Sequence, residues 1–217
     1  MSKAGQSELK RVAAIYDQQA PTWDRQVGLT ERLLVGSALR RQLGQQLHGD
    51  VLEIGTGTGS TLPYLHFGPD AVHTFIGTDL SRGMLQQVDR SQGSMHLAQM
   101  SADTLAFPDN TFNVVTCSLV LCTVPDPGAA MLEMARVCKP DGRLVLLEHV
   151  RARNPALAWL QRKLTPGQHE RLGCHLDRET GQLLKDLGFR IEAEQRRFFG
   201  IFVLITAKPD RYDEFGA

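Results

Sequence analysis

The chain lacks a surplus of charge of either sign. Its 217 residues contain 24 Lys and Arg and 24 Asp and Glu, so its formal net charge is zero. This balance argues against a non-specific polyanion binder, because contacts to phosphates require a surplus of basic side chains. We therefore expect no nucleic acid among the partners, although a local basic patch stays possible.

Cysteine is sparse, and long apolar runs are missing. The N-terminal residues MSKAGQSELKR lack the apolar core of a signal peptide, and no apolar run approaches membrane-spanning length. We expect a cytoplasmic protein with reduced thiols. No metal site is predicted, because no CxxC pair and no zinc spacing with histidine is found among the four cysteines, Cys117, Cys122, Cys138 and Cys174.

The composition is that of an ordinary globular protein, with 42% hydrophobic and 22% charged residues. The length suits one α/β domain, and no repeat, low-complexity tract or linker interrupts the chain. We expect a single domain over residues 1–217, with residues 1–47 as an N-terminal helical cap. Residues 150–178 are expected to be an inserted lid over the substrate.

Apolar runs alternate with segments of helical spacing, which predicts a mostly parallel sheet covered by helices on both faces. The last two strands are separated only by residues 198–200, so they must form an antiparallel hairpin. The expected fold is α/β and Rossmann-like, a doubly wound seven-stranded sheet that ends in this hairpin. Strands are expected at 51–54, 72–78, 95–99, 112–119, 143–149, 190–197 and 201–207, and helices at 28–47, from about Thr58, at 81–88, at 127–137 and at 177–187.

The most informative stretch is VLEIGTGTG, residues 51–59, where a buried strand leads into a glycine loop. Glycines permit positive φ and let a ligand lie against the backbone. A helix that starts after the loop would present free N–H groups to an anionic group. That group could be the pyrophosphate of a dinucleotide or the carboxylate of S-adenosylmethionine.

Three features favour S-adenosylmethionine over a dinucleotide. The glycine spacing is G-x-G-x-G, and Ser60 stands where a third dinucleotide-binding glycine would be expected. Asp79 ends the next strand, where a carboxylate can accept hydrogen bonds from ribose hydroxyls of either ligand. Glu53 decides between them, because it could receive a methionyl ammonium but would repel a pyrophosphate.

The chain resembles class I methyltransferases of the ubiquinone/menaquinone-biosynthesis and "type 11" group over roughly residues 16–208. In this order the motifs that carry the resemblance are highly specific, whereas each is weak alone. They are Tyr16-Asp17, Trp23-Asp24, the glycine loop, Gly77-Thr78-Asp79-Leu80-Ser81, Met84-Leu85, the segment ADTLAFPD at 102–109 and the segment RVCKPDGRL at 136–144.

The resemblance implies S-adenosyl-L-methionine as cofactor and assigns roles around it. The glycines cradle the donor, Asp79 holds the ribose, Leu80 packs on the adenine, and Tyr16 closes over the donor. Ser101 stands where the family often has Asp, which puts a side-chain contact to the adenine amino group in doubt. The donor-binding residues expected are Tyr16, Glu53, Gly55, Thr56, Gly57, Gly59, Asp79, Leu80, Met84, Ser101, Ala102, Ser118 and Leu119.

The acceptor side is less well defined by the sequence. The segments Leu147–Val150 and Gly173–Arg178 are similar to methyltransferase-like thiol methyltransferases and to bacterial phospholipid N-methyltransferases. His149, at the end of a strand, is the candidate general base, and a structural histidine is the equally weighted alternative. Acceptor contacts are expected among Trp23, Trp159, Cys174 and His175, of which Trp23 could instead anchor a helix, Cys174 be a buried hydrophobe and His175 a packing residue.

Leu157, Leu160 and Leu164 form an apolar stripe close to Trp159 and several basic residues. The stripe could dock on a membrane surface or pack against the protein, and we favour packing because the chain has zero net charge.

The expected function is methyl transfer from S-adenosylmethionine to a small acceptor that is apolar or carries a thiol. A quinol, a phenol or a phospholipid amine is the alternative acceptor. A nicotinamide oxidoreductase and a non-catalytic donor-binding subunit are the alternatives from other classes.

Overall fold

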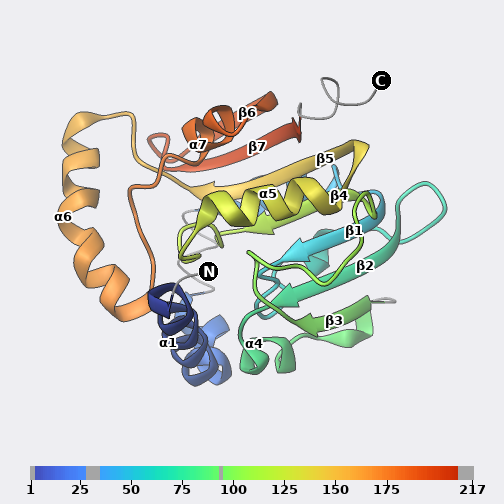
Figure 1. Cartoon of the computed structure of the whole chain (residues 1–217), viewed down its shortest axis with the longest axis horizontal. Helices are drawn as coiled ribbons and strands as arrows, with labels where there is room; N and C mark the ends of the chain where they lie inside the picture. Colours follow the sequence, from blue (N-terminus) through green and yellow to red (C-terminus); the bar gives the residue numbers. More distant parts are fainter. Residues whose placement is uncertain (1–2, 28–34, 93–94, 210–217) are drawn as a thin grey trace.

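The computed structural model describes residues 3–27, 35–92 and 95–209 of the chain, and Figure 1 shows a central sheet flanked by helices. The strands are β1 (Gly49–Ile54), β2 (Val72–Asp79), β3 (Met95–Gln99), β4 (Phe112–Ser118), β5 (Cys138–His149), β6 (Phe189–Arg197) and β7 (Phe202–Pro209). The helices are α1 (Lys3–Gln19), α3 (Gly36–Gly44), α4 (Arg82–Gln86), α5 (Pro127–Val137), α6 (Pro155–Leu172) and α7 (Thr180–Asp186), with 3-10 turns η1 (Ala20–Thr22), η2 (Leu62–Tyr64) and η3 (Arg90–Gln92).

The sheet has the predicted architecture. Its seven strands lie in the order β3-β2-β1-β4-β5-β7-β6, and the pairs from β3 to β5 are all parallel. β7 pairs antiparallel with both β5 and β6. The expected fold class and the terminal hairpin are therefore confirmed.

Alternate strand residues point into two separate cores, one on each face of the sheet. On one face, Leu52 and Val115 pack with Met131 and Met134 of α5. On the other face, Val51 packs with leucines of α3, among a cluster that also includes Val114 and Val145. This two-sided burial explains why the central strands read as continuous apolar runs rather than as alternating ones.

One expected helix is missing. The segment after the glycine loop, from Thr58 on, forms turns and then only the 3-10 turn η2. Its sequence explains why, because Gly59, Pro63, Gly68 and Pro69 fall within the few residues that separate β1 from β2. Glycine and proline both oppose a continuous α-helix, so the glycine loop is followed by turns instead of a helix start.

Several element boundaries also differ from the expected ones. The helix expected over 28–47 is α3, and residues 28–34 lie outside the described residues. Ser81 caps α4 as expected, because its Oγ accepts a hydrogen bond from the Met84 N–H at 3.0 Å, but α4 ends at Gln86. β5 begins at Cys138 rather than at Arg143, and a register shift in its pairing with β4 accommodates the added residues.

The apolar stripe of α6 does not pack against the protein as we favoured. Trp159, Leu160 and Leu164 are exposed, whereas Leu157 is half-buried. Figure 1 shows α6 standing at one edge of the molecule, where only its C-terminal end approaches α1. None of the helices that the structure describes combines the length and the apolar character that a membrane crossing requires.

Candidate active site

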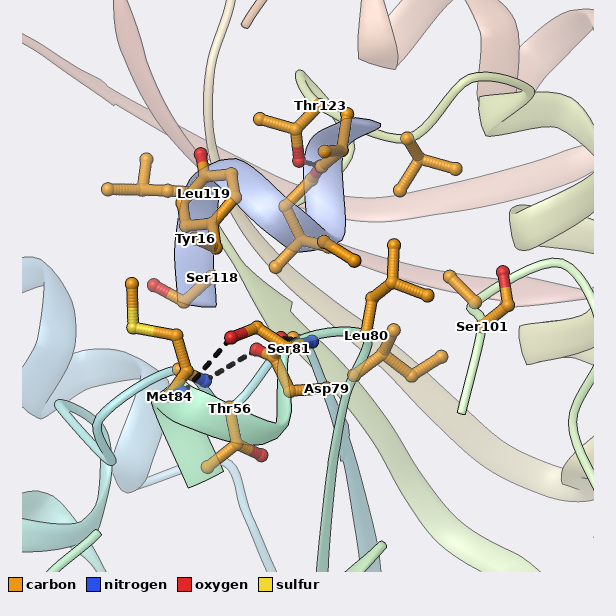
Figure 2. Close-up of a pocket in the computed structure, with 18 of the residues that line it drawn as sticks. Tyr16, Thr56, Asp79, Leu80, Ser81, Met84, Ser101, Ser118, Leu119 and Thr123 are labelled. Carbon is orange, nitrogen blue, oxygen red and sulfur yellow. Dashed lines mark hydrogen bonds between the residues drawn. The ribbon is translucent and has the colours of Figure 1, made fainter. Parts of the chain in front are cut away.

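A cavity lies beyond the carboxyl ends of β1, β2 and β4, the position at which doubly wound sheets bind ligands. It contains about 930 Å³ of empty space, part of it open to solvent. Figure 2 shows side chains around it that come from widely separated parts of the chain, among them Tyr16, Asp79 and Leu119. All but one of the expected donor-binding residues either line the cavity or belong to its glycine loop; the lining includes Tyr16, Trp23, Arg40, Gly55, Thr56, Gly57, Asp79, Leu80, Met84, Ser101, Ala102, Ser118, Leu119, Val120 and Thr123.

The glycine loop places bare backbone against the cavity. Gly55, Gly57 and Gly59 have φ values of 65°, 58° and 88°, a conformation that side chains rarely adopt. A Cβ on Gly55 would lie 2.3 Å from Val120 Cγ2, whereas a Cβ on Gly57 would meet no protein atom within 4 Å. Gly55 is thus needed for packing inside the protein, while Gly57 leaves room for a ligand.

Asp79 is fixed by two backbone donors. Its Oδ2 accepts the Gly57 N–H and its Oδ1 accepts the Ser81 N–H, both at 2.8 Å. Burial is the main cause that raises the pKa of this carboxyl above its ordinary value. Each oxygen retains further acceptor capacity, so the group can receive hydroxyl donors from the cavity.

Glu53, on β1, is buried with 1% of its surface exposed, and it does not belong to the lining of the cavity. Desolvation raises its pKa to about 7, against smaller opposing effects of Thr61 and Arg40. Its Oε2 has no hydrogen-bond partner. A buried, unpaired carboxylate oxygen directly behind the glycine loop is chemically suited to receive a positive charge.

Arg40 is a site residue that the sequence analysis missed. It lines the cavity from α3 with only 7% of its surface exposed, and its Nη1 donates to Ser118 Oγ at 3.1 Å. A signal was present, because Arg40 lies within the Leu39–Leu43 segment that faces the core. A charged residue on a buried helix face usually has a specific partner.

The N-terminal segment covers the cavity. The rings of Tyr16 and Trp23 lie 5.3 Å apart, and both line the cavity. Asp17 accepts hydrogen bonds from Ser81 Oγ at 2.5 Å and from the Gly83 N–H at 2.7 Å. Asp24 accepts one from Thr58 Oγ1 at 2.7 Å. The motifs Tyr16-Asp17 and Trp23-Asp24 therefore each supply one ring to the cavity and one carboxylate that attaches the cover.

The loop after β4 forms another wall of the cavity. It starts at Leu119, whose φ of 60° is unusual for a residue with a side chain. The buried Glu148 holds it from behind, since its Oε1 accepts the Val120 and Leu121 N–H groups at 2.9 and 3.0 Å. Arg178 donates to the carbonyls of Leu121 and Val124.

The remaining candidates lie behind or away from this wall. His149 Nε2 lies 3.2 Å from Cys174 Sγ, and the backbone N–H of His175 donates to the backbone carbonyl of Cys122 at 2.9 Å. None of His149, Cys174, His175 and Trp159 is among the described residues that line the cavity. Their catalytic and acceptor-binding roles stay predictions.

Ser101, which stands where Asp is common, donates to Asp103 Oδ1 at 2.5 Å. Its hydroxyl is thus already engaged beside the cavity, next to Ala102. Met84 lines the cavity although only 1% of its surface is exposed, so its expected role as a donor contact stays a prediction.

Comparison with known proteins agrees with this geometry. Residues 52–146 match the model of a family described as "Methyltransferase domain". A demethylmenaquinone methyltransferase of Lactiplantibacillus plantarum is 33% identical over 172 residues, which cover 73% of this chain and 72% of that protein. The chain belongs to this methyltransferase family. Membership implies S-adenosylmethionine as the donor, as expected, and it sets aside the nicotinamide alternative.

Two further comparisons, one of sequence and one of structure, show other methyltransferases that this chain is similar to. A phosphatidylethanolamine N-methyltransferase of Cereibacter sphaeroides is 36% identical over 135 residues, which cover 59% of this chain and 64% of that protein. The SAM-dependent methyltransferase TM1293 of Thermotoga maritima shares the fold, with a TM-score of 0.68 and 20% identity over 90% of this chain and 99% of that one. The chain spans only 45% to 64% of the length of four curated relatives that it matches.

Proposed function

We propose that this chain transfers the methyl group of S-adenosylmethionine to a small acceptor that is apolar or carries a thiol. The observation that supports this proposal is the charge of the cavity wall. Among the described residues that line it, only Arg40 and Asp79 carry a charge. Both are suited to the polar ends of the donor, so the wall that is left for an acceptor is uncharged.

The residues present fit the donor. Asp79 offers acceptors for the ribose hydroxyls and Arg40 a partner for the carboxylate, while Glu53, buried behind the glycine loop, places a carboxylate near the ammonium without lining the cavity. Gly57 leaves space along the loop. The bound donor would supply an electrophilic sulfonium methyl, while the protein aligns the acceptor and excludes water under the cover formed by Tyr16 and Trp23.

The chemistry of the wall favours a thiol among the acceptors. Apart from Asp79, no side chain in the described lining is an ordinary general base at neutral pH. A thiol, with a pKa near 8.5, ionises with little help, whereas a phenol near 10 requires more. A quinol or a phospholipid amine, the acceptor types in the names of two relatives, is the second candidate.

In this proposal the segment 1–47 acts as the cover of the donor, and 150–178 influences the acceptor indirectly. Arg178 supports this indirect role, because it holds the loop at Leu121 and Val124, whose neighbours Val120 and Thr123 line the cavity. The His149 imidazole is separated from the lining by the same loop. It would act as a base only if this loop moved.

An activity screen with methyl-labelled S-adenosylmethionine tests the proposal, with thiols, quinols, phenols, amines and phosphatidylethanolamine as acceptors. We expect labelled product with a small apolar thiol, and much less with the Asp79→Ala variant at a donor concentration that does not saturate it. Product with phosphatidylethanolamine or a quinol alone would replace the thiol by the second candidate. Donor binding without transfer to any class would favour the non-catalytic donor-binding subunit.

A further inference from the structure

Three side chains with soft or borderline metal-binding atoms meet behind the loop after β4. They are Cys122 in that loop, His149 at the end of β5, and Cys174 just after α6. One atom of each, the two sulfurs and a ring nitrogen, lies within 4.8 Å of the other two. The three segments are far apart in sequence, so neither a CxxC pair nor a local histidine spacing could have revealed them.

The distances suit a single ion. Tetrahedral zinc with thiolate and imidazole ligands holds its donor atoms about 3.6–3.8 Å apart. His149 Nε2 and Cys174 Sγ are already 3.2 Å apart, and a small outward movement would admit a metal between them. Both cysteines are buried, which would shield the ligands from competing water.

We propose that Cys122, His149 and Cys174 form a binding site for a thiophilic divalent cation, with zinc as the expected ion. Binding requires both cysteines as thiolates and the His149 ring nitrogen that faces the ion unprotonated, so it displaces any protons that these groups carry. Two thiolates then balance the charge of the ion, and the neutral imidazole supplies the third ligand. Three protein ligands leave one coordination position for water or another donor atom.

The surroundings contain one favourable and one opposing charge. Glu148, next to His149 on β5, is buried and its Oε2 has no hydrogen-bond partner. Arg178 opposes a cation, but its guanidinium is directed to the carbonyls of Leu121 and Val124. A metal here would attach the cavity loop to β5 and to the end of α6, and it would make His149 a ligand rather than a base.

Cobalt titration of the reduced, metal-free protein tests the site. We expect one equivalent of Co²⁺ to produce thiolate-to-metal charge-transfer absorption and tetrahedral ligand-field bands, which one equivalent of Zn²⁺ removes. Cys122→Ser and Cys174→Ser should each weaken binding by about tenfold or more. Cys138→Ser, at the buried start of β5, is the matched control and should bind like the unchanged protein.

Two outcomes would overturn the proposal. One is the absence of charge-transfer absorption when cobalt is added to the reduced wild-type protein. A separate finding that mild oxidation joins Cys122 to Cys174 in a disulfide would then assign the pair to redox chemistry instead of metal binding. The other is absorption that survives both serine variants, which would place the metal elsewhere. If a serine variant does not fold, the wild-type stoichiometry and absorption still decide whether thiolates bind the ion.

A second observation, independent of the first, concerns the surface of the molecule. Six large hydrophobic side chains are exposed among the described residues, and five of them lie on α6 or on the turn between β6 and β7. The turn lies beside the start of α6, since a Cβ on Gly200 would be 3.8 Å from Arg153 Cγ. The five are Trp159 at 58%, Leu160 at 45%, Leu164 at 53%, Phe198 at 47% and Phe199 at 74% exposure.

This apolar surface is accompanied by positive charge. Residues 151–172 contain five Lys or Arg and one Asp or Glu, in a chain whose total charge is zero. Arg151, Arg153 and Arg196 pair with Glu179 or Glu194, so the positive charge considered for docking is that of Arg162, Lys163 and Arg197. Lys163 Nζ lies 5.9 Å from the centre of the Trp159 ring. An apolar face bordered by cations is complementary to the surface of an anionic bilayer.

We infer that α6 and the turn at Phe198–Gly200 dock on a bilayer surface that contains anionic phospholipid. Trp23→Phe leaves Trp159 as the single tryptophan that reports on docking. With vesicles of phosphatidylcholine and phosphatidylglycerol, we expect its emission to shift to the blue and to be quenched by brominated lipid. Phosphatidylcholine alone, or high salt, should weaken the response.

A pair of variants separates docking from other causes. Leu160→Asp with Leu164→Asp should lower vesicle binding by about tenfold or more. Leu132→Asp, which changes the exposed leucine of α5, should have no effect. The inference fails if Trp159 does not respond to anionic vesicles. It also fails if the same shift occurs without vesicles and sedimentation shows a dimer that the double variant abolishes.

Discussion

The glycine-loop wall of the cavity and the wall formed by the Leu119–Val124 loop are held by different kinds of contact. In the first, the contacts join two sequence motifs, because the Gly57 and Ser81 N–H groups donate to Asp79, 22 and 2 residues away. The second is held by the side chains of Glu148 and Arg178, which bond Val120 and Val124 across 28 and 54 residues and belong to no donor motif. The residues of the first wall can be recognised as motifs in the sequence, whereas the side chains that hold the second cannot.

The largest expected effect comes from removing the distant support. Arg178→Met should lower the free energy of unfolding by about 3 kcal/mol, because two carbonyls of the loop lose charge-assisted hydrogen bonds. Chemical denaturation measures the change. Arg197→Met, an exposed arginine on β6, is the control and should alter stability little. Equal stability of the two variants would mean that the loop does not depend on Arg178.

His149→Ala tests whether His149, which lies behind the Leu119–Val124 loop, acts as the general base. For a phenol or a protonated amine, losing a general base should reduce turnover by roughly a hundredfold. For a thiol, the loss should shrink as the assay pH rises past the thiol's pKa near 8.5, because solvent then supplies the thiolate. Full turnover with the true acceptor at pH 7 would show that His149 is not the base.

On the glycine-loop wall, Asp79→Ala should weaken donor binding by about 1.5–3 kcal/mol, through lost hydrogen bonds to a charged group. Calorimetry with S-adenosylmethionine or its demethylated product measures this loss. Asp109→Ala removes a carboxylate that pairs with Arg136 at 2.7 Å outside the cavity lining, and it should leave donor affinity intact. A donor affinity that Asp79→Ala does not change would place the ribose elsewhere.

Glu53 should make donor affinity depend on pH. Its folded pKa of about 7 lies above the ordinary 4.5, so its contribution to stability is complete below 4.5 and is lost as pH rises through 7. The ammonium of the donor prefers the ionised form, so affinity should fall by about tenfold as pH is lowered below 7. Glu53→Gln should bind more weakly at pH 8, lose this dependence and stabilise the donor-free protein there. A pH-dependent affinity that survives the substitution would exclude Glu53 as the cause.

Of these substitutions, Trp159→Ala should have the smallest effect on donor affinity and on turnover with a soluble acceptor. The ring lies on the exposed face of α6, so donor affinity and turnover with a soluble acceptor should stay within about twofold, as for other exposed substitutions. A large loss of turnover with a soluble acceptor would restore the acceptor-binding role predicted for Trp159. Kinetics with soluble and vesicle-bound acceptors separate these outcomes.

Most of the donor site was predictable because its residues follow the strands in a fixed order. Parallel strands bring their carboxyl ends to one edge, so Gly55, Asp79 and Ser118 had to meet there. Arg40 was not predicted, since its approach to Ser118 depends on how α3 packs on the sheet. The helix expected after Thr58 does not form, for a local reason: the glycines and prolines of that segment oppose a continuous α-helix.

The sequence by itself determined the fold class, the terminal hairpin and the donor motifs, because these depend on periodicity and on residues close together in the chain. Only the tertiary structure decided which face of α6 is exposed, since helical spacing locates a stripe but not the element it faces. The meeting of Cys122, His149 and Cys174 was likewise a tertiary outcome. Three residues from separate loops and strand ends come together only when the sheet order is fixed, and no spacing in the sequence encodes their distance.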